Sequence, residues 1–182
     1  MMTKISAIIL TLFISFSVVA QKKADNKPAT IKWYSLEDAF KLNKEFPKKK
    51  IFVDVYTDWC GWCKKMDATT FSDSTVIEYM NANFYSVKLN AEQKDSLIID
   101  GKLFVNPNPT ANRSTHQIAE MLLNNRMSYP SYVFMDEMGR PITIVPGFLE
   151  VATFIPIIHY FGDNEYFKKS WEVYQKEFGS KK

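Results

Sequence analysis

"VDVYTDWCGWCK", residues 53–64, joins a strand-forming run to a pair of cysteines that lie three positions apart. The run is rich in β-branched and aromatic residues, which favours a strand buried on both faces. Cys60 and Cys63 follow it between two tryptophans and open a segment with helical character. They are the only cysteines in the 182-residue chain. The chemistry of this pair therefore bears most directly on what the protein does.

The two cysteines have four candidate roles. As a structural staple, a Cys60–Cys63 disulfide would close a very short loop and stabilise the fold by about 2 kcal/mol, at the low end for disulfides. A zinc site needs two further ligands, and the chain offers only His116 and His159, neither spaced as in a zinc knuckle or finger. Two thiolates alone permit a copper(I) site. We favour a redox-active dithiol and interpret both histidines as structural or surface residues.

A cysteine at the start of a helix is chemically reactive. Unpaired backbone N–H groups and the positive end of the helix dipole stabilise a thiolate, and so lower the pKa of Cys60. We expect Cys60 to attack a client disulfide and form a mixed disulfide. Cys63, one helical turn further along, would then attack Cys60 and release the reduced client.

The rest of the chain alternates strands and helices. We expect strands at 51–57, at 84–90 and on both sides of a turn at 138–140, and a hairpin with a type I′ turn at Asp100-Gly101. Helices are expected at 35–46 with Ser35 as N-cap, after Cys60, at 74–84, at 114–127 with Ser114 or Thr115 as N-cap, and from Leu149 onward with interruptions around Pro156 and Gly162. This order predicts an α/β fold with a central mixed sheet flanked by helices.

With these elements in place, residues 31–161 resemble the thioredoxin superfamily, and most of all exported thioredoxin-like proteins with a "WCxWCK" site and an insertion. The resemblance rests on "WCGWCK", on Asp54 six positions before the first cysteine, on Lys88 in "KLN" and on Pro130. It implies a thioredoxin fold in which Asp54 is a buried carboxylate, Lys88 approaches it, and the bond before Pro130 is cis. The chain departs from ordinary thioredoxin in Gly61-Trp62 between the cysteines.

The same resemblance suggests roles for the residues around the cysteines. Asp54 would accept the Cys63 proton, with a pKa raised by burial and moderated by Lys88. The alternative is that Asp54 only forms a structural ion pair or caps a turn.

Four further residues are expected to bind the client chain. A cis bond would expose the backbone of Tyr129, next to Pro130, to an extended client. Trp59 and Trp62 either pack on the domain or present an apolar face to a client; we expect Trp59 to be partly packed and Trp62 to be exposed.

The chain divides into a leader and one domain. Residues 1–20 have the lysine, the short apolar run and the small final residue of a secretory signal peptide, so cleavage after Ala20 and export, to a periplasm, are expected; the alternative is an uncleaved N-terminal anchor. Residues 21–30 read as a flexible leader and 31–182 as the thioredoxin-like domain. Within the domain, 91–129 is an insertion that should leave and return at the active-site edge, and 163–182 a C-terminal helical extension.

Function and partners follow from these features. The formal net charge of +3 is too small to favour nucleic acid as a partner, and no apolar span is expected in the mature form, which should be monomeric. We expect an exported thiol-disulfide oxidoreductase without a cofactor or metal, more reducing than oxidising, since no histidine lies between the cysteines. It would act on disulfide-bearing client proteins and receive electrons from a membrane-embedded thiol donor. The alternative is a non-catalytic module that holds a client or copper(I).

Overall fold

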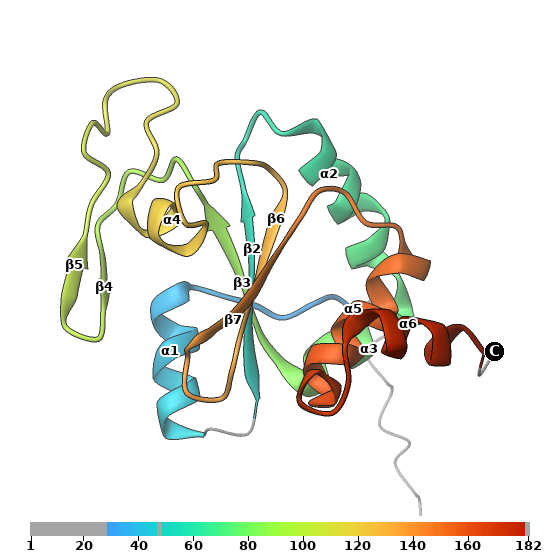
Figure 1. The fold of residues 1–182 in the computed structure, drawn as a ribbon. Helices are drawn as coiled ribbons and strands as arrows, with labels where there is room; N and C mark the ends of the chain where they lie inside the picture. Colours follow the sequence, from blue (N-terminus) through green and yellow to red (C-terminus); the bar gives the residue numbers. More distant parts are fainter. Residues whose placement is uncertain (1–28, 47–48, 181–182) are drawn as a thin grey trace, which may run out of the picture.

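A computed structural model describes residues 29–46 and 49–180 (Figure 1). The expected signal peptide and all but the last two residues of the expected leader lie outside the described residues. Within the described part, five strands form one sheet in the order β1-β3-β2-β6-β7. In that order they span Trp33–Tyr34, Phe84–Asn90, Lys50–Tyr56, Ser131–Met135 and Pro141–Pro146. Strands β1, β3 and β2 are parallel to one another, β6 is antiparallel to β2, and β7 is antiparallel to β6. The predicted mixed sheet is therefore confirmed.

The helices cover both faces of the sheet (Figure 1). On one face lie α1 (Leu36–Glu45), α4 (Gln117–Leu122) and a hairpin of β4 (Leu97–Ile99) and β5 (Lys102–Phe104). On the other face lie α2 (Gly61–Ala68), the 3-10 turn η1 (Thr70–Ser72), α3 (Ser74–Asn83), α5 (Val151–Gly162), the 3-10 turn η2 (Glu165–Phe167) and α6 (Trp171–Ser180). No helix among the described ranges combines the length and the apolar character needed to cross a bilayer.

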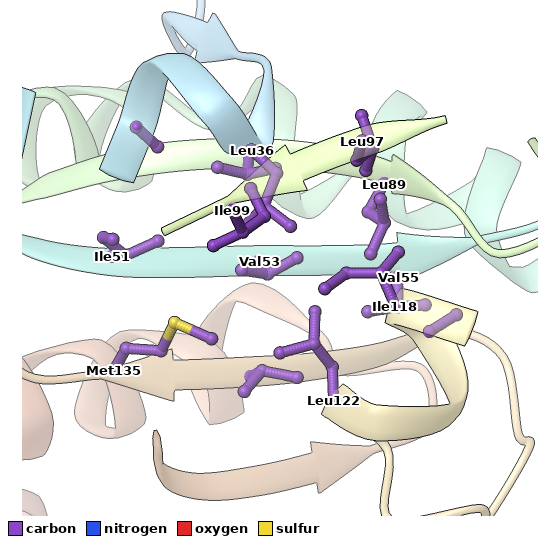
Figure 2. Packing of buried hydrophobic residues seen from close by; sticks show 14 of the residues in the cluster. Leu36, Ile51, Val53, Val55, Leu89, Leu97, Ile99, Ile118, Leu122 and Met135 are labelled. Atoms are coloured by element: carbon purple, nitrogen blue, oxygen red, sulfur yellow. The ribbon is translucent and has the colours of Figure 1, made fainter. Parts of the chain in front are cut away.

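Strand β2 is the centre of the core. All of its residues except the last are buried, because β3 pairs with one edge, β6 with the other, and helices cover both faces. Its side chains alternate between two apolar clusters: Val53 and Val55 contribute to the cluster that contains α1, and Phe52 to the other. Figure 2 shows Val53 and Val55 beside Ile99 of the hairpin and Ile118 of α4. Each such buried side chain contributes about 1.5–3 kcal/mol of hydrophobic stabilisation.

Local signals in the sequence account for most element boundaries. Strand β3 has the bounds predicted for it, and the Ser35 side chain accepts a hydrogen bond from the N–H of Asp38, as an N-cap does. The hairpin is also confirmed: Asp100 and Gly101 have φ angles of 54° and 76°, and a type I′ turn requires positive φ at both positions.

Two helix predictions are wrong. Neither Ser114 nor Thr115 caps α4: the N-cap is His116, and the Ser114 hydroxyl instead donates to Asn106 Oδ1 at 2.6 Å. The helix also ends at Leu122 rather than at residue 127, since Asn124 and Asn125 adopt left-handed φ angles of 51° and 59°.

The second error concerns Pro156, which does not interrupt α5. The helix continues through the proline to Gly162. Phe154 and Ile158, on either side of Pro156, are fully buried in the core. Their packing offsets the backbone hydrogen bond that a proline cannot donate. The interruption predicted at Gly162 is confirmed, since the chain leaves α5 there and resumes as α6.

The same substitution at two glycines should have opposite effects on stability. Gly61, at the first position of α2, has no atom within 4 Å of an added Cβ, so Gly61→Ala should stabilise the oxidised protein by about 0.4–1 kcal/mol. Gly101 has similar space but a φ of +76°, so Gly101→Ala should destabilise it by about 1–2 kcal/mol. Urea unfolding of both variants would measure the difference, and equal changes in the free energy of unfolding would contradict the assignment.

Candidate active site

The two cysteines lie where β2 passes into α2, as the sequence predicts. Cys60 is the N-cap of α2 and is joined to Cys63 by a disulfide bond. The backbone N–H of Cys63 donates to the sulfur of Cys60 at 3.0 Å, and the backbone N–H of Cys60 donates to the carbonyl of Thr57 at 3.1 Å. A first-turn N–H that points at the N-cap sulfur stabilises negative charge there, and the helix dipole has the same effect.

Both cysteines are buried in the disulfide state. The exposed fractions are 4% for Cys60 and 2% for Cys63, so these values alone do not separate an attacking sulfur from a sheltered one. Trp59 and Trp62 flank the pair with exposed fractions of 51% and 57%. The expected contrast between a packed Trp59 and an exposed Trp62 is therefore small. Both indoles are more than half exposed, and each contacts a different set of neighbours.

An ion pair joins the strand that leads to the cysteines to its neighbour in the sheet. Asp54 of β2 and Lys88 of β3 are directly opposite each other in the parallel register, and their side chains form an ion pair at 2.8 Å. Burial raises the pKa of Asp54 from 3.8 to about 6, while Lys88 acts in the opposite direction. A carboxyl group with such a pKa is mostly ionised at neutral pH but binds a proton more readily than an ordinary aspartate, which suits a group that exchanges protons.

Lys88 is enclosed by aromatic rings as well as by carboxylates. Its ammonium lies 5.0–5.5 Å from the ring centroids of Trp33, Tyr56 and Phe71. It also forms an ion pair with Asp67 of α2. Burial lowers the pKa of Lys88, but the carboxylates outweigh burial and the net direction is upward, so the group stays charged. This positive charge limits the rise in the pKa of Asp54.

Asp67 is absent from the residues that the sequence predicted for the site. It lies four positions after Cys63, on the same side of α2, and its negative charge raises the pKa of Asp54. The four-residue spacing indicates that Asp67 lies on the same side of the helix as Cys63. It does not indicate that Lys88, on a strand, forms an ion pair with Asp67. The contact with Lys88 depends on how α2 packs against β3.

The predicted cis bond between Tyr129 and Pro130 is confirmed. The carbonyl of Pro130 accepts a hydrogen bond from Gly147 at 2.8 Å, which fixes the start of β6. Within residues 29–46 and 49–180, the N–H and C=O groups of Tyr129 make no backbone hydrogen bond. The Tyr129 ring contacts Trp59 edge to face, with centroids 5.9 Å apart. The structure thus brings Tyr129 beside the residue that precedes Cys60.

The segment between β3 and β6, which the sequence predicts to be an insertion, contributes two side chains that the sequence did not predict for the site. The Trp59 indole N–H donates to both carboxylate oxygens of Glu92, at 3.0 and 3.1 Å. The guanidinium carbon of Arg113 lies 4.9 Å from the centroid of the Trp59 ring. On the other side of the cysteines, Trp62 packs against Phe148 with centroids 5.4 Å apart.

The histidines take no part in this site. His116 is fully buried, and its Nδ1 accepts a hydrogen bond from the backbone N–H of Ile118, which caps α4. His159 pairs with Asp163, the C-cap of α5. Across the described ranges, no group of three or more His, Cys, Asp or Glu side chains is arranged to hold a metal ion.

The raised pKa of Asp54 predicts how its removal should affect stability. Because its pKa in the folded protein exceeds the unfolded value of 3.8, the folded protein binds more protons than the unfolded chain between about pH 4 and 6. Stability is therefore lost as pH rises through this window. Asp54→Asn removes this effect and should stabilise the oxidised protein more at pH 7.5 than at pH 4, by up to about 3 kcal/mol.

The measurement is urea unfolding of oxidised protein at both pH values. Asp58→Asn serves as the control, because Asp58 is an exposed carboxylate two positions from Cys60 whose side chain accepts a hydrogen bond from Asn90. A stability difference between Asp54→Asn and wild type that is the same at both pH values would show that the carboxyl is not perturbed by burial.

Comparison with known proteins places this site in a family. A family model described as a thioredoxin-like domain matches residues 36–162. A thiol:disulfide interchange protein DsbD from Yersinia pestis is 29% identical over 110 residues, which cover 59% of this chain and only 15% of that protein. A solved thioredoxin-fold protein from Helicobacter pylori has a TM-score of 0.55 at 16% identity, covering 73% of this chain and 81% of that one. A structure described as a DsbH oxidoreductase has a TM-score of 0.53 at 19% identity, covering 78% and 92%.

At these identities the solved structures show the fold, whereas the family model also covers the segment with the cysteine pair. That match spans the sheet from β2 to β7, the Cys60–Cys63 disulfide and the cis bond before Pro130. The chain therefore belongs to the family of thioredoxin-like domains.

Proposed function

We propose that this protein is an exported thiol-disulfide oxidoreductase that reduces disulfides in client proteins. The observation that carries the proposal is the N–H of Cys63, which points at the Cys60 sulfur at the N-terminus of α2. Once the disulfide is reduced, this donor and the helix dipole favour a Cys60 thiolate, which is the form that attacks disulfides. The similarity to a thiol:disulfide interchange protein over 59% of the chain supports the same chemistry.

The first step forms a mixed disulfide. The Cys60 thiolate attacks one sulfur of the client disulfide, so that a Cys60–client bond forms and the client's sulfur–sulfur bond breaks. The second client sulfur leaves as a thiolate and takes a proton from water. A client chain held in extended form beside the free backbone groups of Tyr129 would present its disulfide next to Trp59 and Cys60.

The second step releases the client. Cys63 loses its proton to Asp54, directly or through water, and the resulting thiolate attacks the Cys60 sulfur. The Cys60–Cys63 bond forms, the Cys60–client bond breaks, and the client leaves as a dithiol with two more electrons. The product is the disulfide seen in the structure. With a pKa of about 6, Asp54 is ionised at neutral pH but basic enough to take a proton.

The reducing direction is favoured by the charges near the pair. Gly61 and Trp62 lie between the cysteines, so no histidine cation is present there to stabilise the reduced form. Asp54 lies on the strand that leads to Cys60 and Asp67 on the helix that contains Cys63, and both pair with one cation, Lys88. The net negative charge of these three groups opposes part of the stabilisation that the helix N-terminus gives to the Cys60 thiolate, and so favours giving up electrons.

Repeated turnover requires a source of electrons and a compartment in which disulfides form. We assign the first role to a membrane-embedded thiol donor, which would reduce the Cys60–Cys63 bond by the same exchange chemistry in reverse. The signal-peptide pattern of residues 1–20 supports export to an oxidising compartment such as a periplasm. We treat the domain as a monomer.

Two cysteine variants test the function. Wild-type protein should accelerate the reduction of insulin by dithiothreitol, and Cys60→Ser should lower the rate to background because the attacking sulfur is gone. Cys63→Ser should instead accumulate mixed disulfides with clients, since the first step proceeds and the second cannot. Non-reducing gels would detect these species.

Each outcome separates a different alternative. Mixed disulfides that accumulate in Cys60→Ser rather than in Cys63→Ser would reverse the two roles. Wild-type protein that binds insulin but does not accelerate its reduction would point to a non-catalytic module that holds its client.

A further inference from the structure

Trp59 is fixed beside the cysteines by residues of the insertion. Its indole N–H donates to Glu92 at 3.0 and 3.1 Å, and the Tyr129 ring meets it edge to face. Arg113 approaches the same ring, with its guanidinium carbon 4.9 Å from the centroid. We call these four residues, Trp59, Glu92, Arg113 and Tyr129, the Trp59 platform. Because Trp59 precedes Cys60 in the chain, the platform borders the site at which a client disulfide is attacked.

The backbone that presents Arg113 is held in a costly conformation. Arg113 has a φ of 60°, in the left-handed region that costs a non-glycine residue about 1–2 kcal/mol. The adjoining segment is tied down by Asn106, which is buried and donates through its amide to the carbonyls of Gln93 and Ser114, at 3.0 and 2.8 Å. The Arg113 side chain is therefore directed onto Trp59 by an ordered loop.

The hydrogen-bonding edge of the Arg113 guanidinium has no partner in the described part of the chain. Stacking on an aromatic ring uses the face of a guanidinium and leaves its N–H groups available. Among the described residues, no carboxylate forms an ion pair with Arg113, whereas Arg140 pairs with Asp136 at 2.7 Å. A planar cation of this kind matches a carboxylate, which it can bind through two parallel hydrogen bonds.

Glu92 and Asp58, the acidic side chains beside Trp59, form no ion pair with Arg113 in the described part of the chain. The carboxylate of Glu92 already accepts from Trp59, and that of Asp58 accepts from Asn90 at 3.1 Å. On the far side of the pair, Lys65 lies 5.0 Å from the Trp62 ring centroid and forms no ion pair within the described ranges. Arg113 and Lys65 thus each place a cation against a tryptophan beside the cysteines, and neither cation pairs with a carboxylate of the described residues.

We propose that Arg113 is a specificity-determining residue that binds a client carboxylate within about two residues of the client cysteine. The inference rests on the proposed function and names its substrate class: disulfides of acidic peptide segments. Arg113 acts by holding the client in place beside Cys60 and takes no part in the exchange of sulfur bonds. The insertion then favours disulfides that lie next to a client carboxylate, because it places the positive charge of Arg113 beside the active site.

The test compares matched peptide disulfides. Each peptide carries one Asp within two positions of the cysteine, on either side, and its partner carries Asn at the same place. For at least one position, wild-type protein should reduce the Asp peptide with a kcat/KM about threefold to tenfold higher than the Asn peptide. Arg113→Gln should bring this ratio to about one, and Arg113→Lys should retain part of it, since a lysine keeps the charge but loses the planar fork.

Lys94→Gln is the control variant. It removes the same charge from an exposed position of the insertion, two residues from Glu92, and should leave the ratio unchanged. A wild-type ratio of one at every position, or a preference that survives in Arg113→Gln, would overturn the proposal. An equal loss of preference in both variants would also overturn it, because it would show a general effect of charge.

A binding measurement separates this inference from the proposed function. The same peptides with Ser in place of Cys are added to oxidised protein, and the NMR signal of the Trp59 indole N–H is followed. Binding of the Asp peptide that depends on Arg113, without turnover of any disulfide, would support the carboxylate site and refute the oxidoreductase. Turnover of the disulfides without any preference for the Asp peptide, in rate or in binding, would support the oxidoreductase and refute the carboxylate site.

Discussion

Strand β2 is buried on both faces and paired along both edges, and the position of the reactive pair depends on this constraint. The strand lies between β3 and β6 and sends alternate side chains into two apolar clusters. The strand ends at Tyr56, and α2 begins five residues later at Gly61. Cys60 is therefore held at the first turn of a helix that is anchored to the core through Met66. The free N–H groups of this first turn can stabilise a thiolate on Cys60.

The same burial explains the chemistry expected of Asp54. A carboxyl group on a fully enclosed strand loses hydration, which disfavours its charged form and raises its pKa. Lys88 limits the cost, because it lies directly opposite in the parallel register. Asp67 shares that lysine, so the three groups carry one positive charge for two acids. This arrangement gives Asp54 a pKa near 6 and still pairs its charge with that of Lys88.

The segment between β3 and β6 borders the cysteine pair. It starts after β3 and returns before β6, so both of its ends lie near the cysteines. Near its start it supplies Glu92, from its central loop Arg113, and at its end Tyr129, and all three contact Trp59. Long segments that cross an active-site edge often carry specificity, since the scaffold beneath them fixes the chemistry.

The sequence by itself determined the elements whose signals are local. The β-branched run predicted β2, the Asp-Gly pair predicted the hairpin turn, and the spacing of Cys60 and Cys63 at a helix start predicted the disulfide site. In each case the physical cause acts within about four residues: side-chain shape, the φ angles of a turn, and the free N–H groups of a first helical turn. The resemblance to thioredoxins added the Asp54–Lys88 pair and the cis bond before Pro130.

Tertiary structure decided what depends on distant segments. Arg113 and Trp59 are 54 positions apart (113 − 59), and Asp67 and Lys88 are 21 apart (88 − 67), so no local pattern indicates either contact. Ser114 has the chemistry of a helix cap, yet its hydroxyl binds Asn106 because the loop fold brings that side chain closer. In the same way, core packing keeps Pro156 inside a continuous α5 against its backbone preference. Packing free energies of several kcal/mol outweigh local propensities of about one, and they are set by which surfaces the whole chain brings together.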